Sequence, residues 1–453
     1  MPTYDLLIRG GTLVGPNGPP QCADLAVVEG RIVAIGPDLA GDGVETIDAA
    51  TLHIFPALID AHVHFNEPGR ADWEGIASGS VAIAAGGGSL YFDMPLNARP
   101  PTTTVAAFDQ KRAAAESASH VDFALWGGLV PGNIDEMEGL AARGAIGFKA
   151  FMSNSGIDDF QAADDLTLYE GMARAASLGR IVAVHAENEA ITGSLGRRAI
   201  AQGHTGARDY LASRPIMAEI EALGRAILIA GETGCRLHIV HVSTGCGVAM
   251  VAEARARGLD VSCETCPHYL VLEEGDLERL GAVAKCAPPL RPRAEQEALW
   301  DQIATGALPM VASDHSPSPA ELKTGDDYFR IWGGISGCQS TLQLLLTEGH
   351  TRRQLPLAAI ARIVADFPAA RFGLSPRKGR LAIGSDADIA LVDLPATTVL
   401  AAAALRYRHQ HSPYVGRTLQ GRIARTIVRG QTVWRDGRIV SDPLGRLVTP
   451  SAR

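Results

Sequence analysis

The stretch LHIFPALIDAHVHFNEPGR, residues 52–70, decides the fold because an apolar, β-branched run leads directly into two histidines. The run LHIFPALID is expected to form one buried strand. His62 and His64 are two residues apart, a spacing that places both imidazoles on the same face of a strand. Two imidazoles side by side at a strand end form half of a site for a divalent metal ion. The alternative, two polar residues on a solvated edge, fits poorly with so apolar a strand and with the turn expected at Pro68 and Gly69.

Seven further strand-like runs follow, separated by stretches of helix-forming composition such as residues 102–119 and 247–258. Strand-then-helix units repeated eight times over about 300 residues predict a (β/α)8 barrel of the TIM type, which typically needs ~250 residues or more. The strand-like runs are HIFPALIDAHVHF at 53–65, GGSLYFDMP at 87–95, VDFALWGGL at 121–129, AIGFKAF at 145–151, RIVAVHAE at 180–187, RLHIVHVS at 236–243, LDVSCETCP at 259–267 and LPMVASDHS at 308–316.

Both ends of the chain show a different pattern, with short alternating strands joined by turns that contain Gly and Asp. The stretches at 4–15, 23–36 and 45–50 resemble those at 379–394 and 425–440. Isolated hairpins are marginally stable, so the two ends are expected to combine into one small β-sandwich. The predicted domains are the sandwich, from residues 1–51 and 376–453, and the barrel, from residues 52–375.

Composition narrows the class of protein. The chain has 453 residues, of which 46% are hydrophobic and 20% charged, as in ordinary globular proteins. A net charge of −9 without a basic run argues against nucleic acid as a partner. No apolar stretch approaches the ~20 residues that cross a bilayer, and the N-terminus lacks the form of a signal peptide. Seven scattered cysteines argue against a disulfide framework, so we expect a cytosolic protein that binds neither nucleic acid nor membrane.

Polar groups that can bind metals lie at or near the ends of five strand-like runs. Taken singly, each could be a satisfied core histidine or a helix cap. Active sites of (β/α)8 barrels lie at the C-terminal ends of the strands, however, so these groups are expected to converge on one metal site. They are His62 and His64 on the first run, Lys149 on the fourth, His185 on the fifth, His241 on the sixth and Asp314 on the eighth.

Lys149 is unusual because it lies inside the apolar run AIGFKAFM. An unpaired buried ammonium is costly, so burial lowers the pKa of the amine. Its head could instead reach solvent at the strand end or pair with an acid. The functional interpretation is that the neutral amine reacts with carbon dioxide to give a carbamate. This anion has two oxygens and can bridge two cations ~3.5–4 Å apart.

A set of motifs in one order gives the chain a family resemblance: HVHFNEPG, DMPLN, GFKAFM, HAEN, HIVHVS, CETCPHYL, CAPPLR and SDHSP. Together they resemble the cyclic amidohydrolases, most closely the allantoinase family, over nearly the whole chain. The resemblance implies that His62 and His64 bind the more buried metal and that His185 and His241 bind the second. It further implies that carbamylated Lys149 (N6-carboxylysine) bridges the two metals. Asp314 would then complete the first site and act as the catalytic proton shuttle.

The resemblance also implies a cofactor and a reaction. Two divalent metal ions are expected per subunit, zinc first, with cobalt, iron, manganese and nickel also suited to the ligands. A metal-bound hydroxide would open the hydantoin ring of allantoin to give allantoate. The protein would act on a small molecule and assemble as a homotetramer or a homodimer.

Two departures from related enzymes favour allantoin as the substrate. Dihydroorotase-like relatives carry an arginine two residues after the second histidine, where this chain has Asn66. Dihydropyrimidinase- and hydantoinase-like relatives carry a tyrosine in the loop after the lysine, which here reads FMSNSGIDDF. Substrate contacts are expected from Asn66 and Asn97 and from backbone groups at Ala287 and Gly333. Two alternatives stay open, a hydantoinase or dihydropyrimidinase acting on another neutral cyclic amide, and a catalytically silent homologue used for assembly.

Overall fold

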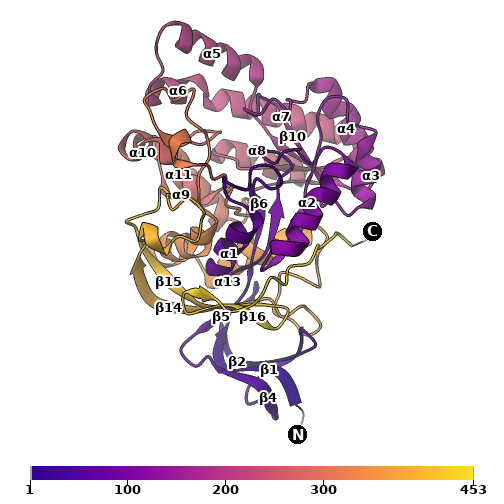
Figure 1. The fold of residues 1–453 in the computed structure, drawn as a ribbon, viewed down its shortest axis with the longest axis vertical. Coiled ribbons are helices and arrows are strands. Elements are labelled where there is room, and N and C mark those ends of the chain that lie inside the picture. Colours follow the sequence, from indigo (N-terminus) through magenta and orange to yellow (C-terminus); the bar gives the residue numbers. More distant parts are fainter. Residues whose placement is uncertain (1–2, 452–453) are drawn as a thin grey trace.

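A helix-covered barrel and a smaller β-domain make up the molecule (Figure 1). The computed structural model of the protein describes residues 3–451. The N-terminal strands and the C-terminal strands lie together below the barrel, although they are the two ends of the chain. The predicted (β/α)8 barrel is confirmed, and both chain ends combine in one small β-domain as predicted for the β-sandwich, with their strands joined in a single nine-stranded sheet. The domain boundaries given above stay predictions.

Parallel strands form the wall of the barrel in chain order. They pair as β6-β7-β8 and as β9-β10-β11-β12-β13, and only Trp126 separates β8 from β9 along the chain. All residues of β6, β7, β8 and β11 are buried, as expected for a sheet covered by helices. The strands are β6 Leu58–Val63, β7 Gly88–Asp93, β8 Asp122–Leu125, β9 Gly127–Gly128, β10 Phe148–Phe151, β11 Ile181–His185, β12 Arg236–Ile239 and β13 Val261–Cys263.

The eighth run closes the barrel, but not as the continuous strand that was predicted. Within it, Val311 forms an isolated parallel bridge with Thr265, and His315 forms one with Val63. Between these bridges Asp314 has a φ of 46°. This left-handed backbone interrupts an extended ladder, so the segment contacts its neighbours at two separate points.

The first run divides between the two sheets, so the prediction of one continuous strand over residues 52–60 is wrong. Strand β5, His53–Pro56, pairs with the β-domain, whereas β6 pairs with β7 of the barrel. Pro56 has no N–H to continue a ladder. Immediately after it, the N–H of Ala57 donates to Asp388 O and that of Leu58 donates to Gly87 O.

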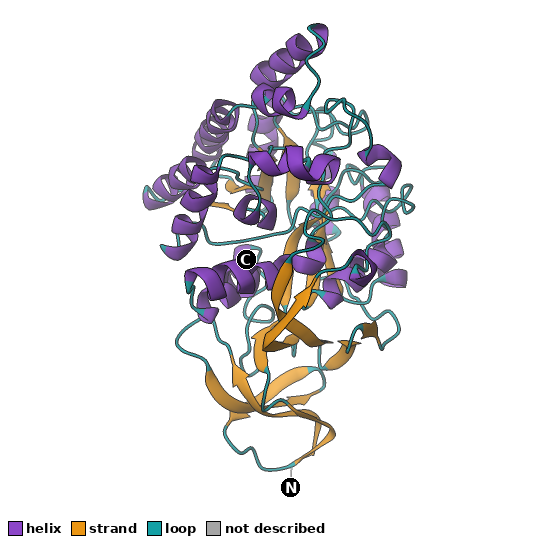
Figure 2. Cartoon of the chain, turned by 90° about the vertical axis from the view of Figure 1, so that its left-hand side faces the viewer, coloured by secondary structure: helices purple, strands orange, loops and turns teal. Residues whose placement is uncertain are grey.

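Helices cover the outside of the barrel (Figure 2). Both helices predicted above are present as α2 and α8, and the hydroxyl of Thr104 caps α2 by accepting from Ala107 N. The α-helices are α1 Ile76–Ala85, α2 Val105–Ala118, α3 Glu136–Ala142, α4 Asp165–Ser177, α5 Glu189–Ala201, α6 Ala207–Ser213, α7 Ile216–Thr233, α8 Gly245–Ala256, α9 Pro267–Val271, α10 Glu274–Leu280, α11 Arg293–Ala304, α12 Thr341–Leu344, α13 Leu357–Ala361 and α14 Phe367–Arg371. Short 3-10 helices are η1 Gly281–Ala284, η2 Ala320–Lys323, η3 Cys338–Ser340 and η6 Ala402–Ala404, and π-helical turns are η4 Leu345–Arg352 and η5 Arg362–Asp366.

The β-domain is a nine-stranded sheet in the order β17-β16-β15-β14-β5-β1-β2-β3, with β4 paired to β1. Its core combines residues from both ends of the chain, among them Leu6, Leu25 and Ile389. The further strands are β1 Thr3–Leu13, β2 Gln21–Val28, β3 Arg31–Gly36, β4 Asp42–Asp48, β14 Ile389–Val399, β15 Thr418–Val428, β16 Gln431–Arg435 and β17 Arg438–Ile439.

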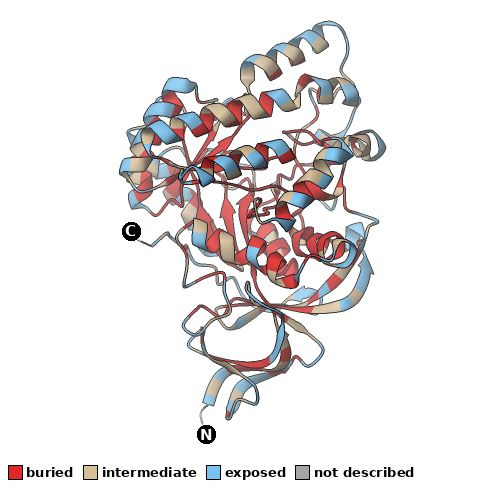
Figure 3. Ribbon diagram, turned by 180° about the vertical axis from the view of Figure 1, so that it is seen from behind, coloured by how far each residue is buried: buried red, intermediate tan, exposed pale blue. Residues whose placement is uncertain are grey.

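Phe372 is buried in a cluster with residues of the barrel strands. Its ring packs edge-on against Phe92 and Trp126, at centroid distances of 5.1 and 5.4 Å. The barrel interior is buried along its length (Figure 3). The last residue of β11, His185, lines a cleft, so the open end is the one at which the strands finish. No helix within residues 3–451 is long and apolar enough to cross a membrane.

Candidate active site

His62 and His64 lie at the end of β6 and face Asp314. Their Nε2 atoms are 3.2 and 3.4 Å from Asp314 Oδ1, and their ring centres are 5.4 Å apart. One ligand atom from each of the three residues lies within 4.8 Å of the others. The spacing of two along a strand has thus placed both imidazoles beside a carboxylate contributed by the last barrel segment.

Glu264, at the end of β13, fixes the orientation of His62. Its Oε1 is 2.6 Å from His62 Nδ1, and its Oε2 is 3.1 Å from His238 Nε2. When a carboxylate binds one ring nitrogen of a histidine, the other nitrogen is left to bind a metal ion. This arrangement is common among zinc-binding histidines. Burial lowers the pKa of His62 well below its usual range, so the ring stays neutral, as metal binding requires. Glu264 was quoted within a motif above, but the sequence assigned it no role.

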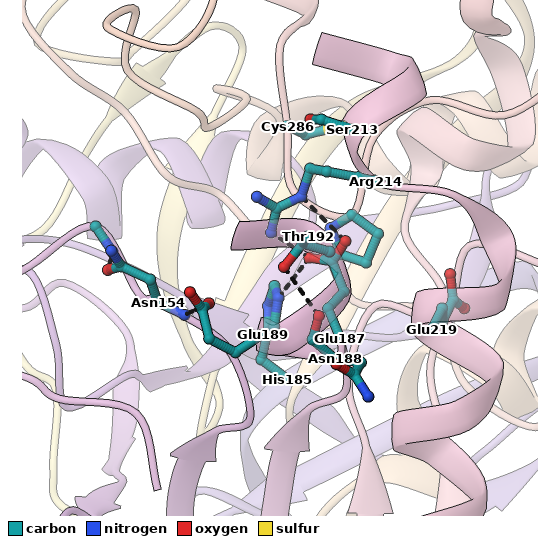
Figure 4. Close-up of polar contacts among 12 residues, drawn as sticks. Asn154, His185, Glu187, Asn188, Glu189, Thr192, Ser213, Arg214, Glu219 and Cys286 are labelled. Carbon is teal, nitrogen blue, oxygen red and sulfur yellow. Dashed lines mark hydrogen bonds and ion pairs between the residues drawn. The ribbon is translucent and has the colours of Figure 1, made fainter. Parts of the chain in front are cut away.

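His185, at the end of β11, faces His241, which follows β12. Its Nδ1 is 2.9 Å from His241 Nε2. Its Nε2 is 2.7 Å from Glu187 Oε2 (Figure 4). Arg214 holds that carboxylate in turn, with Nε 3.0 Å from Oε1 and Nη2 on Oε2. Against the effect of burial, Arg214 and His185 hold the pKa of Glu187 below its usual range. His185 therefore presents Nδ1, and His241 presents Nε2, to a common point.

The two pairs of histidines belong to one site. The ring centres of His62 and His241 are 5.5 Å apart, and burial lowers the pKa of His241 well below its usual range. Neutral imidazoles from β6 and β12 thus lie side by side, as the predicted convergence at the strand ends requires.

Lys149, on β10, is fully buried beneath these histidines, and its Nζ has no hydrogen-bond partner among residues 3–451. Burial lowers its pKa to about 7, although Asp314 and Glu264 oppose the shift. The ammonium lies 4.9 Å from the centre of the Phe151 ring. A side chain in this state is a neutral amine in a substantial fraction of molecules at neutral pH.

Two other buried lysines of the chain lie beside carboxylates. The Nζ of Lys111 lies 3.0 Å from Asp93 Oδ2 and donates to Met94 O. The Nζ of Lys378 lies within 3.0 Å of three carboxylates, those of Asp122, Asp386 and Asp388. Among residues 3–451, Lys149 has neither a carboxylate nor a backbone carbonyl at hydrogen-bond distance, which sets it apart from both of them.

Four site residues have positive φ angles, which residues other than glycine seldom adopt. These angles are 64° at Asn66, 71° at Asn97, 41° at His241 and 46° at Asp314. Backbone strain of this kind persists only where the surrounding structure enforces it, and it concentrates at functional sites. Three of the four residues, Asn97, His241 and Asp314, line the cleft at the open end of the barrel.

A cleft of about 450 Å³ opens above the converging side chains. His62, His64, His185, His241 and Asp314 line its floor. Of the predicted substrate contacts, Asn97, Ala287 and Gly333 also line the cleft. Asn66 does not. It is 0% exposed, and its Nδ2 donates to Pro317 O at 3.4 Å.

The sequence missed several residues around this site. Glu187, Arg214 and Glu264 orient the histidines, and Lys285 lies in the wall of the cleft. Cys266 and His268 each place one atom within 4.8 Å of an Asp314 oxygen, a proximity that was not predicted from the sequence. All seven cysteines are free thiols, as the scattered spacing predicted.

Comparisons with known proteins agree with this geometry. The amidohydrolase family model matches residues 53–433. An allantoinase of Rubrobacter xylanophilus is 59% identical over 450 residues, which cover 99% of this chain and 98% of that protein. An allantoinase of Deinococcus radiodurans is 51% identical, with 99% of each chain covered. Among solved structures, an L-hydantoinase (dihydropyrimidinase) of Arthrobacter aurescens is 36% identical, with a TM-score of 0.95 over 98% of this chain and 100% of that one.

The family resemblance of the motifs is thereby confirmed over almost the full length of the chain, and not only at the histidines. The chain belongs to the amidohydrolase family and, within it, to the allantoinases.

Proposed function

We propose that this chain hydrolyses allantoin to allantoate at a centre of two divalent metal ions. The observation that carries the proposal is the convergence of four histidines and Asp314 on one cleft, with Lys149 buried nearby, in a chain that is 40–59% identical to proteins named allantoinase. The proposed ligands are His62, His64, Lys149, His185, His241 and Asp314. When bound, the two ions would polarise the scissile carbonyl group and lower the pKa of a water molecule between them.

The residues present fit such a centre. His62 and His185 each use one ring nitrogen to bind a buried carboxylate and turn the other toward the cleft. The Nζ of Lys149 is buried without a hydrogen-bond partner in the described part of the chain, as is expected of a group that is completed by something not belonging to the chain. Nitrogen and carboxylate ligands suit zinc and its neighbours in the first transition row. We therefore propose two ions per subunit, zinc first, with cobalt, iron, manganese or nickel as alternatives.

Carbamylation of Lys149 is part of the proposal. The neutral amine attacks carbon dioxide and loses a proton, giving an N-carboxylate. A buried amine would thereby become an anion with two oxygens that could bind two metal ions. Without this change, the ammonium would repel both ions.

Asp314 is the proposed catalytic acid and base. Its carboxylate lies in the floor of the cleft, where it can take a proton from the attacking water molecule and deliver it to the departing ring nitrogen. The scissile carbonyl carbon becomes the carboxylate of the product, and the ring nitrogen becomes a terminal amide of a ureido group. Asn97 and backbone groups at Ala287 and Gly333 are proposed to hold the ring. A direct contact from Asn66 remains a prediction from the sequence.

The pH dependence of reconstitution tests the proposed state of Lys149. Only the neutral amine reacts with carbon dioxide, so activation of metal-free protein should become faster as pH rises through the pKa of about 7 and level off above pH ~8. A lysine with an ordinary pKa of ~10.4 would be only about 0.04% neutral at pH 7. The measurement is the rate of activity recovery at fixed dissolved carbon dioxide and fixed free zinc. A rate that still rises tenfold between pH 8 and pH 9 would contradict the lowered pKa.

Steady-state kcat/KM values on allantoin, hydantoin, dihydrouracil and dihydroorotate test the proposed substrate. We expect allantoin to exceed the others by about one to two orders of magnitude. A higher value on dihydrouracil would favour the dihydropyrimidinase alternative, which the fold similarity to an L-hydantoinase (dihydropyrimidinase) also suggests. Purified protein that holds no metal, and stays inactive after addition of zinc and bicarbonate, would indicate a silent homologue.

Assembly and location complete the proposal. Seven free thiols suit a reducing compartment, so we place the enzyme in the cytosol. A homotetramer or a homodimer is expected from the family resemblance.

A further inference from the structure

Lys285 presents an amine to the cleft from its wall. The residue follows η1 and is only 5% exposed, yet it lines the cleft together with Ala287 and Gly333. Its Nζ donates to Ile331 O and lies 4.6 Å from the centre of the Tyr210 ring. These contacts distinguish Lys285 from a surface lysine, whose amine is free in water.

Lys323 offers a direct comparison because it binds the same segment, residues 331–334. Its Nζ donates to Ala282 O at 3.2 Å, to Trp332 O at 3.0 Å and to Gly334 O. An ammonium has three N–H groups, so three acceptors use all of them. Lys323 is not part of the cleft lining. Its three hydrogen bonds to backbone carbonyl groups are therefore those of a residue with a structural role.

The Nζ of Lys285 has more N–H groups than it has acceptors within the described part of the chain. Within the described part of the chain, Ile331 O is the one acceptor bonded to its Nζ. Even as a neutral amine, Nζ carries two N–H groups, and as an ammonium it carries three. At least one N–H is thus left for a ligand in the cleft, since a buried donor without a partner is costly.

The charges around Lys285 favour a neutral ligand group with a strong acceptor oxygen. Burial lowers the pKa of Lys285 to about 7, Arg214 lowers it further, and Asp327 opposes the shift. The carboxylate nearest to Arg214, that of Glu187, is already occupied by Arg214 and His185. A urea oxygen is neutral and accepts two hydrogen bonds, which matches this wall of the cleft.

We propose that Lys285 is a specificity residue that donates a hydrogen bond to the carbonyl oxygen of the exocyclic ureido group of allantoin. Hydantoin has the same ring as allantoin and lacks this group. The inference rests on the proposed function, because it assigns a partner to the part of allantoin that does not react. A site that forms a hydrogen bond with one group discriminates strongly against analogues without that group.

Kinetics of Lys285→Met on allantoin and on hydantoin test the contact, with Lys323→Met as the matched control. Lys285→Met should lower kcat/KM on allantoin by about 10- to 100-fold, the loss expected for one hydrogen bond from a charged or strongly polar donor. On hydantoin it should change kcat/KM by less than about threefold. Lys323→Met should lower both values by one common factor, because it loosens the segment without touching the ureido group.

An equal loss on both substrates in Lys285→Met would overturn the proposal, since that is the result for a residue that only holds residues 331–334. Wild-type kinetics identify a separate failure: protein that does not prefer allantoin to hydantoin would refute the proposed function before any variant is made. An analogue of allantoin with a thioureido group tests the contact in unsubstituted protein, because sulfur is a weak acceptor. We expect kcat/KM on the analogue to fall by about tenfold or more, and an unchanged value would contradict the contact.

Discussion

Lys149→Ala is expected to lose both metal ions and to lower kcat/KM on allantoin by about 10⁴-fold or more, a loss typical of removing a group on which the whole catalytic unit depends. The reason is the position of this amine. It is fully buried close enough to His62, His185 and His241 to lower their pKa values, has no hydrogen-bond partner within residues 3–451, and is the only lysine in our proposed ligand set. Metal analysis of the purified variant and steady-state rates provide the measurement.

Added short-chain carboxylic acids should partly restore Lys149→Ala, because a carboxylate can occupy the space of the lost carbamate and offer two oxygens to the metal ions. Lys323→Met is the matched control. Its pKa is also lowered to about 7 by burial, but its Nζ binds backbone carbonyl groups outside the cleft. This control should keep its metal content. Full activity of Lys149→Ala without added acid is incompatible with a bridging carbamate.

Asp314→Asn should lower kcat by about 10²- to 10⁴-fold, the usual contribution of a positioned acid or base. The amide has nearly the size of the carboxylate and can still approach His62 and His64, whose Nε2 atoms lie 3.2 and 3.4 Å from Asp314 Oδ1. It cannot take up a proton at neutral pH. We therefore expect the variant to keep most of its metal while losing turnover.

Metal content separates this role from a purely structural one. If Asp314→Asn loses metal in the same proportion as activity, the residue acts as a ligand alone. If the variant keeps both metal and activity, Asp314 is not the proton carrier, and another group must fill that role.

The meeting of these histidines could be predicted from local sequence pattern because strand ends in this fold all point to one place, whereas their role as metal ligands stays a proposal. His62 and His64 were predicted from a spacing of two residues along an apolar strand. His185 and His241 were predicted from their positions at the ends of two further strands. Their meeting point, with His62 and His241 ring centres 5.5 Å apart, follows from barrel closure. The family resemblance then supplied the roles.

The residues that the sequence did not reveal act across long separations or through the backbone. Arg214 reaches Glu187 from the loop between α6 and α7, 27 positions away, and no local period relates the two. Lys285 reaches Ile331 O across 46 positions. The first run divides at Pro56 because the residues before it pair with the sheet of the β-domain and those after it pair with the barrel. Apolar composition does not indicate which of two sheets a residue will join.

Substrate contacts were the least predictable part for the same reason. Asn66 was chosen from its place in a motif, but it is buried outside the cleft lining, where its side chain donates a hydrogen bond to Pro317 O. Asn97 does line the cleft, although its φ of 71° is close to the 64° of Asn66. The difference therefore lies in what surrounds each side chain, and Pro317 is 251 positions from Asn66 along the chain.

A crystal structure of the zinc-loaded enzyme, with anomalous data at the metal edge, tests the central claim most directly. We predict two anomalous peaks ~3.5–4 Å apart, enclosed by the six proposed ligands, with electron density that continues past Lys149 Nζ as a planar carboxylate touching both peaks. A single peak, or an unmodified Lys149 beside two ions, would contradict the account.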